Sequence, residues 1–381
     1  MSSSAITPIT MPKWGLTMTE GTVVGWLRQQ GERFAEGEEI LEIETPKITN
    51  VVEASSGGIL RRIVAQAGTT LPVGALLAVV ALDEVPEAEI DAFVAGFAVV
   101  EPSTRQEAEA EGIKPRDIES AGRRLRYLEL GEGDGVPVLL VHGFGADLNT
   151  WMFTQPALAA GRRAVALDLP GHGGSAKDVG AADVESLSDA VEGALGALGV
   201  EQAHLVGHSM GGAIAASLAL RRPERVASLT LIASAGLGPE INASFIDVFV
   251  RMARRREAVE VIGLLVHDPA LVSRTMVEDV LRYKRLDGVS AALAKIAAAW
   301  FPGGRQSLDL TGRIAELAMP VQVIWGRDDR ILPVAHAEAL ANCLPVHIVD
   351  AAGHLPHMEK AGEVNRLIEQ FIGSVSERVG T

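Results

Sequence analysis

The stretch Gly21–Ile43, GTVVGWLRQQGERFAEGEEILEI, decides the fold of the first part of this chain, because the chain repeats its pattern. A shift of 37 positions lays it on Gly58–Val80, GILRRIVAQAGTTLPVGALLAVV, with glycine on glycine at three places. Short apolar runs interrupted by glycine at matched positions indicate two copies of one small β-unit. Neither copy buries its apolar face alone, so we expect the two copies to pack on each other in an all-β domain.

Lys47 lies between the two copies, in the stretch Glu44–Ile48. Pro46 has no N–H to donate to a central ladder, so this stretch is expected to be a turn between strands. A lysine at such a tip projects into solvent at one pole of a rigid β-domain, and this placement suits a covalent carrier arm. The alternative is an ordinary exposed turn lysine.

These residues resemble a lipoyl domain over about residues 5–82. The matching motifs are two opening stretches and an attachment hairpin: Met11–Gly15, Met18–Val23 and Glu44–Lys47. Biotin carriers usually place methionine on both sides of the lysine, whereas Pro46 and Ile48 stand there in this chain. The resemblance therefore implies a lipoyl-type flattened barrel with lipoate attached covalently to Lys47.

The composition indicates a globular protein with more than one domain. Hydrophobic residues make up 48% of the 381 residues, and no run of about 18 apolar residues predicts a membrane span. The start, Met1–Ala5, lacks the pattern of a secretion signal. Cys343 is the single cysteine, so the chain has no internal disulfide, and no Cys/His spacing predicts a metal site. We expect a reducing, cytoplasmic location.

Residues 84–119 hold ten acidic side chains against three basic ones, a net charge of −7 within the −15 of the chain. Such a tract repels itself, so we expect an acidic flexible linker over residues 83–122, spanning about 35 Å. Apolar residues at helical spacing over 86–98 predict a short helix within it. This helix packs on a neighbouring domain or docks a partner. The acidic composition argues against nucleic acid as a partner.

From about residue 123 short apolar runs alternate with helical segments. The expected strands are 136–142, 163–167, 203–207, 227–233, 321–325 and 346–349, and the expected helices are 186–198, 210–221, 335–343 and 362–371. This alternation predicts an α/β fold with a largely parallel sheet covered by helices on both faces.

The stretch Gly207–Gly211, GHSMG, follows one expected strand and opens a helix. This is the context of a G-x-S-x-G nucleophile elbow, in which glycines allow a sharp turn that lifts the Ser209 hydroxyl above the sheet edge. A serine hydroxyl needs a base, and the chain order for this fold is serine, acid, histidine. Asp328 or Asp329 and then His354 follow Ser209 at the ends of later strands.

These motifs resemble the α/β-hydrolase family over about residues 123–375. By that resemblance Ser209 is the nucleophile, His354 the general base and Asp329 the acid that orients the imidazole. The stretch 142–145 (HGFG) looks like an oxyanion loop, which implies backbone amides of Phe144 and Met210 as the oxyanion hole. His357 is the main rival for the base, and the other histidines near the motifs, His142, His172 and His208, are expected to be packing or supporting groups.

The helix-rich stretch of about 236–310 is expected to form a cap over Ser209. It contains one basic cluster in an acidic protein, formed by Arg251 and Arg254–Arg256. This cluster is a solvated helix face or a site for the phosphates of coenzyme A.

A lipoyl domain fused to this fold resembles the dihydrolipoamide acetyltransferase components of acetoin dehydrogenase complexes. The resemblance implies acetyl transfer from lipoyl-Lys47 to coenzyme A, with a thiamine-diphosphate acetoin-cleaving enzyme and a flavin-dependent dihydrolipoamide dehydrogenase as partners. Two alternatives stay open at this point. One is a lipoyl-tethered hydrolase, a thioesterase or carbon–carbon bond hydrolase, and the other is a carrier whose second domain only anchors partners.

Overall fold

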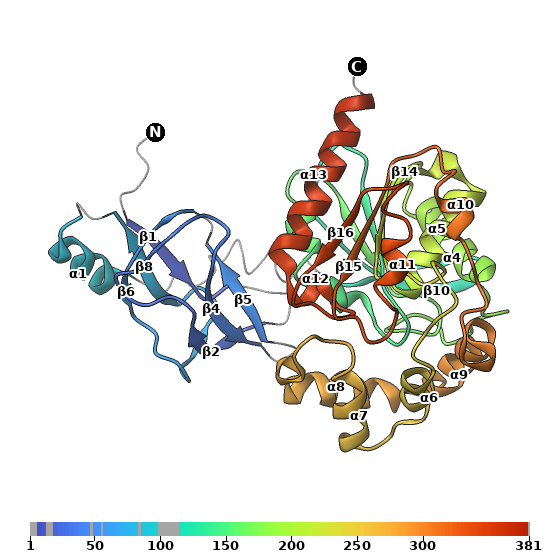
Figure 1. Cartoon of the computed structure of the whole chain (residues 1–381), viewed down its shortest axis with the longest axis horizontal. Helices are drawn as coiled ribbons and strands as arrows, with labels where there is room; N and C mark the ends of the chain where they lie inside the picture. Colours follow the sequence, from blue (N-terminus) through green and yellow to red (C-terminus); the bar gives the residue numbers. More distant parts are fainter. Residues whose placement is uncertain are drawn as a thin grey trace. The chain divides into compact units, whose positions relative to one another are not determined.

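The computed structural model describes residues 6–12, 18–45, 49–54, 56–82, 85–97 and 114–379, which form two compact units (Figure 1). The N-terminal unit is built from β1 (Ile6–Thr10), β2 (Glu20–Trp26), β3 (Arg33–Phe34), β4 (Glu39–Glu44), β5 (Thr49–Glu53), β6 (Gly58–Ile63), β7 (Thr70–Pro72), β8 (Leu76–Ala81) and α1 (Glu87–Gly96). No helix in these described ranges has the length and apolarity needed to cross a membrane.

The two copies of the repeat interlock in a pair of four-stranded antiparallel sheets. One sheet has the order β1-β8-β6-β3 and the other β5-β4-β2-β7. Strand β3 of the first copy pairs with β6 of the second, and β7 of the second copy pairs with β2 of the first. Each copy thus completes the sheet of the other, which explains why neither is expected to fold alone.

The glycines that match across the repeat share backbone conformations that favour glycine. The matched pair Gly31 and Gly68 has positive φ angles of 92° and 85°. The matched pair Gly37 and Gly74 has φ angles of 82° and 83°. The third pair needs glycine for space, because an added Cβ would lie 2.7 Å from Met11 Sδ at Gly21 and 2.3 Å from Val80 Cγ1 at Gly58. The repeat predicted from the sequence is therefore present in three dimensions.

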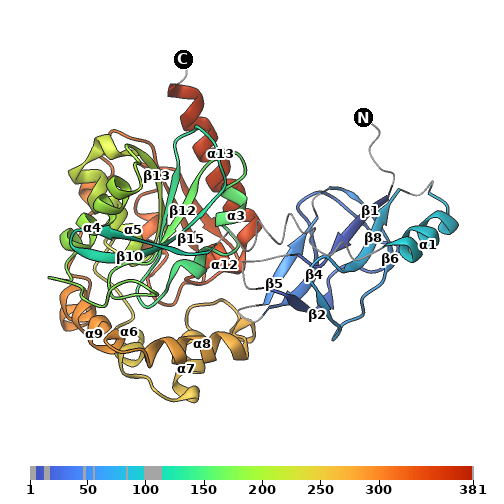
Figure 2. The same cartoon turned by 180° about the vertical axis from the view of Figure 1, so that it is seen from behind.

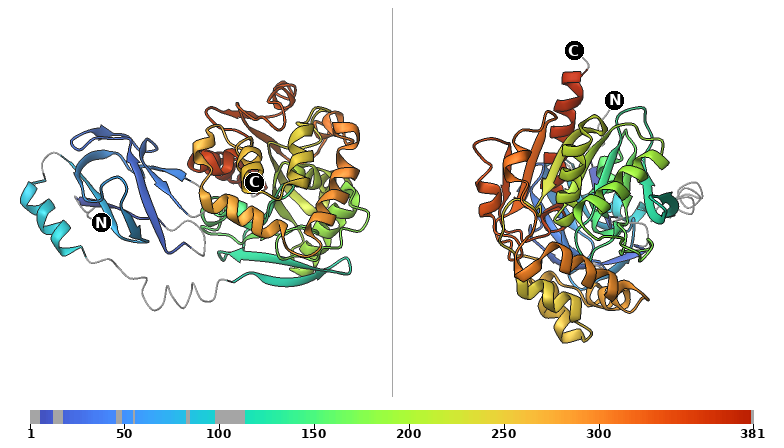
Figure 3. Two further views of the ribbon diagram at one scale, coloured as in Figure 1. Left: turned by 90° about the horizontal axis from the view of Figure 1, so that it is seen from below. Right: turned by 90° about the vertical axis from the view of Figure 1, so that its right-hand side faces the viewer.

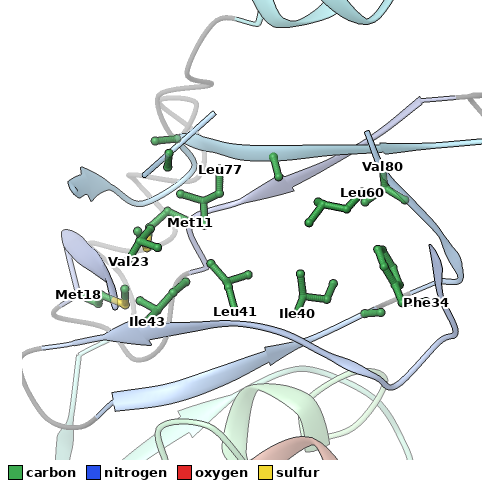
Figure 4. Packing of buried hydrophobic residues seen from close by; sticks show 14 residues of the cluster. Met11, Met18, Val23, Phe34, Ile40, Leu41, Ile43, Leu60, Leu77 and Val80 are labelled. Atoms are coloured by element: carbon green, nitrogen blue, oxygen red, sulfur yellow. The ribbon is translucent and has the colours of Figure 1, made fainter. Parts of the chain in front are cut away.

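Apolar side chains from both sheets meet in one core between them (Figure 4). Leu41 and Ile43 of β4 are fully buried, as are Leu60 of β6 and Leu77 of β8. Burying each such side chain stabilises the fold by about 1.5–3 kcal/mol before the entropy of ordering is subtracted.

The helix predicted within residues 86–98 is present as α1, and it packs on its own domain. Ile90 is fully buried in a cluster with Leu76 and Val79 of β8. On the same side Glu87 forms ion pairs with Arg61 and Arg62 of β6. The apolar side of α1 is therefore already occupied, which favours the packing interpretation over a docking helix.

The C-terminal unit alternates strands of one sheet with the helices that cover it. They are β9 (Arg116–Ser120), β10 (Arg123–Leu130), β11 (Val138–Val141), α3 (Gln155–Leu158), β12 (Ala164–Leu167), α4 (Val184–Ala197), β13 (Ala203–His208), α5 (Met210–Arg221), β14 (Val226–Ile232), α10 (Thr311–Ile314), β15 (Val321–Gly326), α11 (Ala335–Glu338), β16 (Val346–Val349), α12 (Pro356–Glu359) and α13 (Ala361–Val379), with the cap helices α6 (Ala243–Arg251), α7 (Arg255–Ile262), α8 (Arg274–Lys284) and α9 (Val289–Trp300) between β14 and β15.

Eight strands form one sheet in the order β16-β15-β14-β13-β11-β12-β10-β9. The strands from β16 to β12 are parallel, and β10 and β9 add to this edge as antiparallel strands. The sheet thus begins at Arg116, within the range 83–122 that the charge pattern assigns to a linker. The polar alternation of Arg116–Ser120 suits an exposed edge strand, and this is why charge alone misplaced the boundary.

Helices cover both faces of this sheet. The pair α4 and α5 lies on one face, and α3 and α13 lie on the other (Figures 1 and 2). The cap helices α6 to α9 gather at one end of the strands, coloured yellow to orange (Figure 3). The helix expected over 335–343 is shorter than predicted, since α11 ends at Glu338 and turns follow.

Candidate active site

Ser209 stands at a strained turn between β13 and α5. Its φ of 52° and ψ of −120° are unfavourable for a residue with a side chain, as in a nucleophile elbow. The two glycines of the motif are required because no side chain fits at their positions. At Gly207 an added Cβ would lie 2.5 Å from the carbonyl oxygen of Gly211. At Gly211 an added Cβ would lie 2.2 Å from the carbonyl oxygen of Val141. The turn is therefore possible only with glycine on both sides of the serine.

His354 and Asp329 are joined by a buried hydrogen bond. The Nδ1 atom of His354 lies 2.8 Å from Oδ2 of Asp329, and their side chains are 4% and 0% exposed. The other carboxylate oxygen accepts from the amides of Ile331 and Leu332 at 2.8 and 3.0 Å. Because an ionised carboxylate only accepts hydrogen bonds, Nδ1 carries the proton and Nε2 of His354 is left as the acceptor.

The loops that carry the three residues meet at the carboxyl end of the parallel strands. The His208 ring lies 4.9 Å from the ring of His354, and its Nε2 is 2.8 Å from the carbonyl oxygen of that residue. An added Cβ at Gly326 would lie 2.0 Å from the carbonyl oxygen of Gly353, so the acid and histidine loops are in backbone contact. Residues 120 and 145 positions after Ser209 are thus brought to its elbow.

The adjacent Asp328 and the nearby His357 occupy other environments. Asp328 pairs with His267 at 2.8 Å, with each side chain 45% exposed. His357 is fully buried, its Nε2 lies 3.2 Å from Thr150 Oγ1, and burial lowers its pKa to about 3. Of the two acids, the one bonded to His354 is therefore Asp329, and within the part of the chain that the structure describes no carboxylate bonds to the ring of His357.

His142 and His172 serve as hydrogen-bonding supports of the loops beside Ser209. His142 Nε2 accepts from the Leu169 amide at 3.0 Å, and His172 Nε2 accepts from the Gly145 amide at 3.1 Å. Burial lowers the pKa of both rings, that of His172 to about 3. Neutral rings with one accepting nitrogen are what these contacts require.

Met210 and the loop of Phe144, whose amides are the predicted oxyanion hole, lie next to Ser209. Met210 is the first residue of α5, and the first N–H groups of a helix have no intrahelical partner. On the other side, an added Cβ at Gly143 would lie 3.0 Å from Ser209 Cβ, so the loop holding Phe144 touches the elbow.

Two aromatic residues that the sequence did not single out contact Phe144 from the cap region. The rings of Phe249 and Phe301 lie 5.8 and 6.2 Å from its ring. Phe249 also lies 2.2 Å from where a Cβ of Gly145 would be. Phe249 and Phe144 are more than a hundred residues apart in the sequence, so no local motif predicts their contact. The amphipathic pattern of α6 is the one sequence signal that could have identified Phe249 as a buried residue.

Lys47 lies outside the described residues, but the strands on either side of it are defined. Glu44 at the end of β4 pairs with Thr49 at the start of β5. These two strands pair antiparallel, and Lys47 stands between them in the sequence. A lysine between two paired strands offers the primary amine that an amide-linked lipoyl group needs.

The basic cluster of the cap is largely neutralised. Arg251 pairs with Asp247, Arg255 with Glu278 and Arg256 with Glu260. These pairs are exposed and the acids compete with any phosphate, so a solvated helix face accounts for the cluster.

Comparisons with known proteins match both units. A family model described as biotin-requiring enzyme covers residues 7–80, and one described as alpha/beta hydrolase fold covers residues 136–361. The dihydrolipoyllysine-residue acetyltransferase component of the acetoin cleaving system from Pseudomonas putida is 48% identical over 97% of this chain and 99% of its own length. The corresponding component from Cupriavidus necator is 44% identical over 97% and 98%.

A solved structure shares the fold of the second unit. A meta-cleavage product hydrolase from Pseudomonas fluorescens aligns with a TM-score of 0.63 and 26% identity, over 69% of this chain and 98% of its own. The relatives that match along the whole chain, however, carry both units. The chain therefore belongs to the family of dihydrolipoyllysine-residue acetyltransferase components of acetoin cleaving systems, in which a lipoyl domain precedes a domain of the α/β-hydrolase fold.

Proposed function

We propose that this chain transfers acetyl groups to coenzyme A through an acyl-enzyme on Ser209, with His354 as general base and Asp329 as its orienting acid. The observation that carries the proposal is the buried 2.8 Å hydrogen bond from His354 Nδ1 to Asp329 beside the strained elbow of Ser209. This bond leaves Nε2 free to take a proton from the serine hydroxyl.

The reaction has two balanced halves. In the first, His354 Nε2 takes the Ser209 proton, the serine oxygen attacks the thioester carbonyl, the carbon–sulfur bond breaks and the leaving thiolate takes the proton from His354. In the second, His354 takes the proton of the coenzyme A thiol, the new thiolate attacks the serine ester, and Ser209 regains its proton as the carbon–oxygen bond breaks. The amides of Phe144 and Met210 stabilise the oxyanion in both halves.

Lys47 supplies the attachment point for lipoate. When bound, this group supplies a thiol that carries the acetyl group as a thioester. The chain contributes the paired strands β4 and β5, between which Lys47 stands in the sequence, and the two β-sheets that hold these strands in place. A connection between strands of a rigid scaffold is a common location for functional residues.

The homologues place the chain in an acetoin cleaving system, which implies partner enzymes. As specific partners we propose a thiamine-diphosphate enzyme that cleaves acetoin and a flavin-dependent dihydrolipoamide dehydrogenase that reoxidises the arm. The single cysteine, Cys343, is exposed and free, which fits the reducing cytoplasm as the location.

The test separates a transferase from a hydrolase. Purified chain is given S-acetyldihydrolipoamide with and without coenzyme A, and acetyl-coenzyme A and free acetate are both measured. A transferase makes acetyl-coenzyme A as the main product, and its acetate yield falls when coenzyme A is added. Acetate as the main product at saturating coenzyme A would overturn the proposal in favour of the hydrolase, since water would then be the preferred acceptor of the same acyl-serine.

A further inference from the structure

A short segment at the end of α7, Gly263–His267, contacts the loop that carries His354. The amide of His354 donates to the carbonyl oxygen of Leu265 at 2.8 Å. The approach is so close that an added Cβ at Gly353 would lie 2.8 Å from the same oxygen. We call Gly263–His267 the strap segment. It belongs to the stretch between β14 and β15 and not to the sheet that carries Ser209.

Glu359 is a buried carboxylate that links this loop to the strap segment. One oxygen, Oε1, accepts from the Gly353 amide at 2.8 Å, and Oε2 accepts from the His267 amide at 2.6 Å. The side chain is only 5% exposed, and burial raises its pKa. Burying a carboxylate costs free energy unless its oxygens accept hydrogen bonds. Both oxygens of Glu359 accept one here, which is why we ask what these two bonds hold in place.

Arg330 links the acid loop to the same strap segment. It follows Asp329 directly, and its Nη2 donates to the carbonyl oxygen of Gly263 at 2.7 Å and to that of Val266. The strap segment is therefore bonded both to the loop of the base and to the loop of the acid.

We infer that Glu359 is a positioning residue of the triad. Its carboxylate holds the backbone at His354 against the strap segment, and Arg330 holds the loop of Asp329 against the same segment. The inference rests on the triad proposed above. The distance between His354 Nδ1 and Asp329 is then set both by the direct contact of their loops and by a segment outside the sheet. Misplacement of a catalytic group by about 1 Å costs on the order of 100-fold in rate, so this link affects the chemistry directly.

The experiment measures acylation of Ser209 by p-nitrophenyl acetate in the full chain. Glu359→Gln keeps the size of the side chain but turns one oxygen into an N–H donor, which cannot accept from the second amide. We expect the acylation rate per folded molecule to fall about 10- to 100-fold with an unchanged KM. The low-field proton resonance of the His354–Asp329 hydrogen bond should shift or broaden, which a loss of overall stability alone would not produce.

Arg330→Gln is the second variant, and Arg327→Gln is the matched control. Arg327 lies three residues earlier and pairs with the exposed Asp350, so its variant should acylate at the wild-type rate. Glu359 and Arg330 act through one segment. The fold-loss in acylation rate of the double variant should therefore be smaller than the product of the two single fold-losses. Should Glu359→Gln fail to fold, Arg330→Gln decides the question by the same rate and resonance.

A folded Glu359→Gln chain that acylates at the wild-type rate with an unchanged resonance overturns the inference. A double variant whose fold-loss in acylation rate equals the product of the two single fold-losses would contradict the claim that Glu359 and Arg330 act through the strap segment together. A wild-type chain that the ester does not acylate at Ser209 would contradict the proposed triad itself. That failure is seen before any variant is made, so the two failures are distinguishable.

Discussion

His354 donates its Nδ1 proton to Asp329 across 2.8 Å, although 24 residues separate the two in the chain and neither side chain has more than 4% of its surface exposed. Burial of this kind keeps water from competing for the carboxylate. The same carboxylate is held by two backbone amides, so its position does not depend on His354 alone.

Asp329→Asn should lower acetyl-coenzyme A formation by about 10⁴-fold, because the asparagine amide would hold His354 in the wrong tautomer, as an analogous change does in a serine protease. The steady-state rate with S-acetyldihydrolipoamide is the measurement. Asp328→Asn, at the rival acid, is the comparison and should cost far less, since Asp328 bonds to His267 of the strap segment and not to His354. Equal losses in both variants would show that the acid has been misassigned.

Lys47→Arg should remove a lipoyl modification from protein made in cells able to lipoylate. Arginine keeps the charge but offers no amine for the amide bond. Intact-mass analysis compares the two proteins, and the variant should lack the added mass. Identical masses, apart from the substitution, would place the modification elsewhere or exclude it. Acylation of Ser209 by p-nitrophenyl acetate should be the same in both proteins.

The stability of the hydrolase-fold domain should fall with acid in a way that depends on His357. Burial lowers its folded-state pKa to about 3, below its unfolded value near 6.5. The unfolded chain therefore binds a proton first, and stability present above pH 6.5 is lost as the pH falls toward 3. His357→Gln should reduce the slope of unfolding free energy against pH by up to about 1.4 kcal/mol per pH unit in this window.

Urea unfolding between pH 4 and 7 measures this slope. His347→Gln is the control, because His347 lies on β16 with intermediate burial and gives up fewer water contacts on folding. A slope in His357→Gln that matches the wild type would mean that other groups govern the acid sensitivity.

The sequence predicted the fold where a local pattern has one physical solution. Matched glycines such as Gly31 and Gly68 need a positive φ, and Gly207 and Gly211 permit no Cβ, so spacing alone identified the repeat and the elbow. The bond of Asp329 to His354 agrees with the acid and base predicted from the motifs.

Contacts between distant segments were not predictable in this way. A buried Glu359 looks in the sequence like any solvated helical acid, and Arg330 like any loop base, because their partners are backbone groups of the strap segment. The strand Arg116–Ser120 was missed for a related reason, since an edge strand gains its identity from pairing with β10 and not from its own apolar content.

The most direct test of the account is the rate of acetyl-coenzyme A formation by Ser209→Ala. Alanine removes the oxygen that forms the acyl-enzyme and leaves the lipoyl domain unchanged. With S-acetyldihydrolipoamide and coenzyme A as substrates, we predict that the variant makes acetyl-coenzyme A only at the background rate, while the wild-type chain gives an acetyl group on Ser209 that mass spectrometry detects after rapid quenching. A Ser209→Ala chain that makes acetyl-coenzyme A at the wild-type rate would contradict the account and leave the second domain as an anchor for partners.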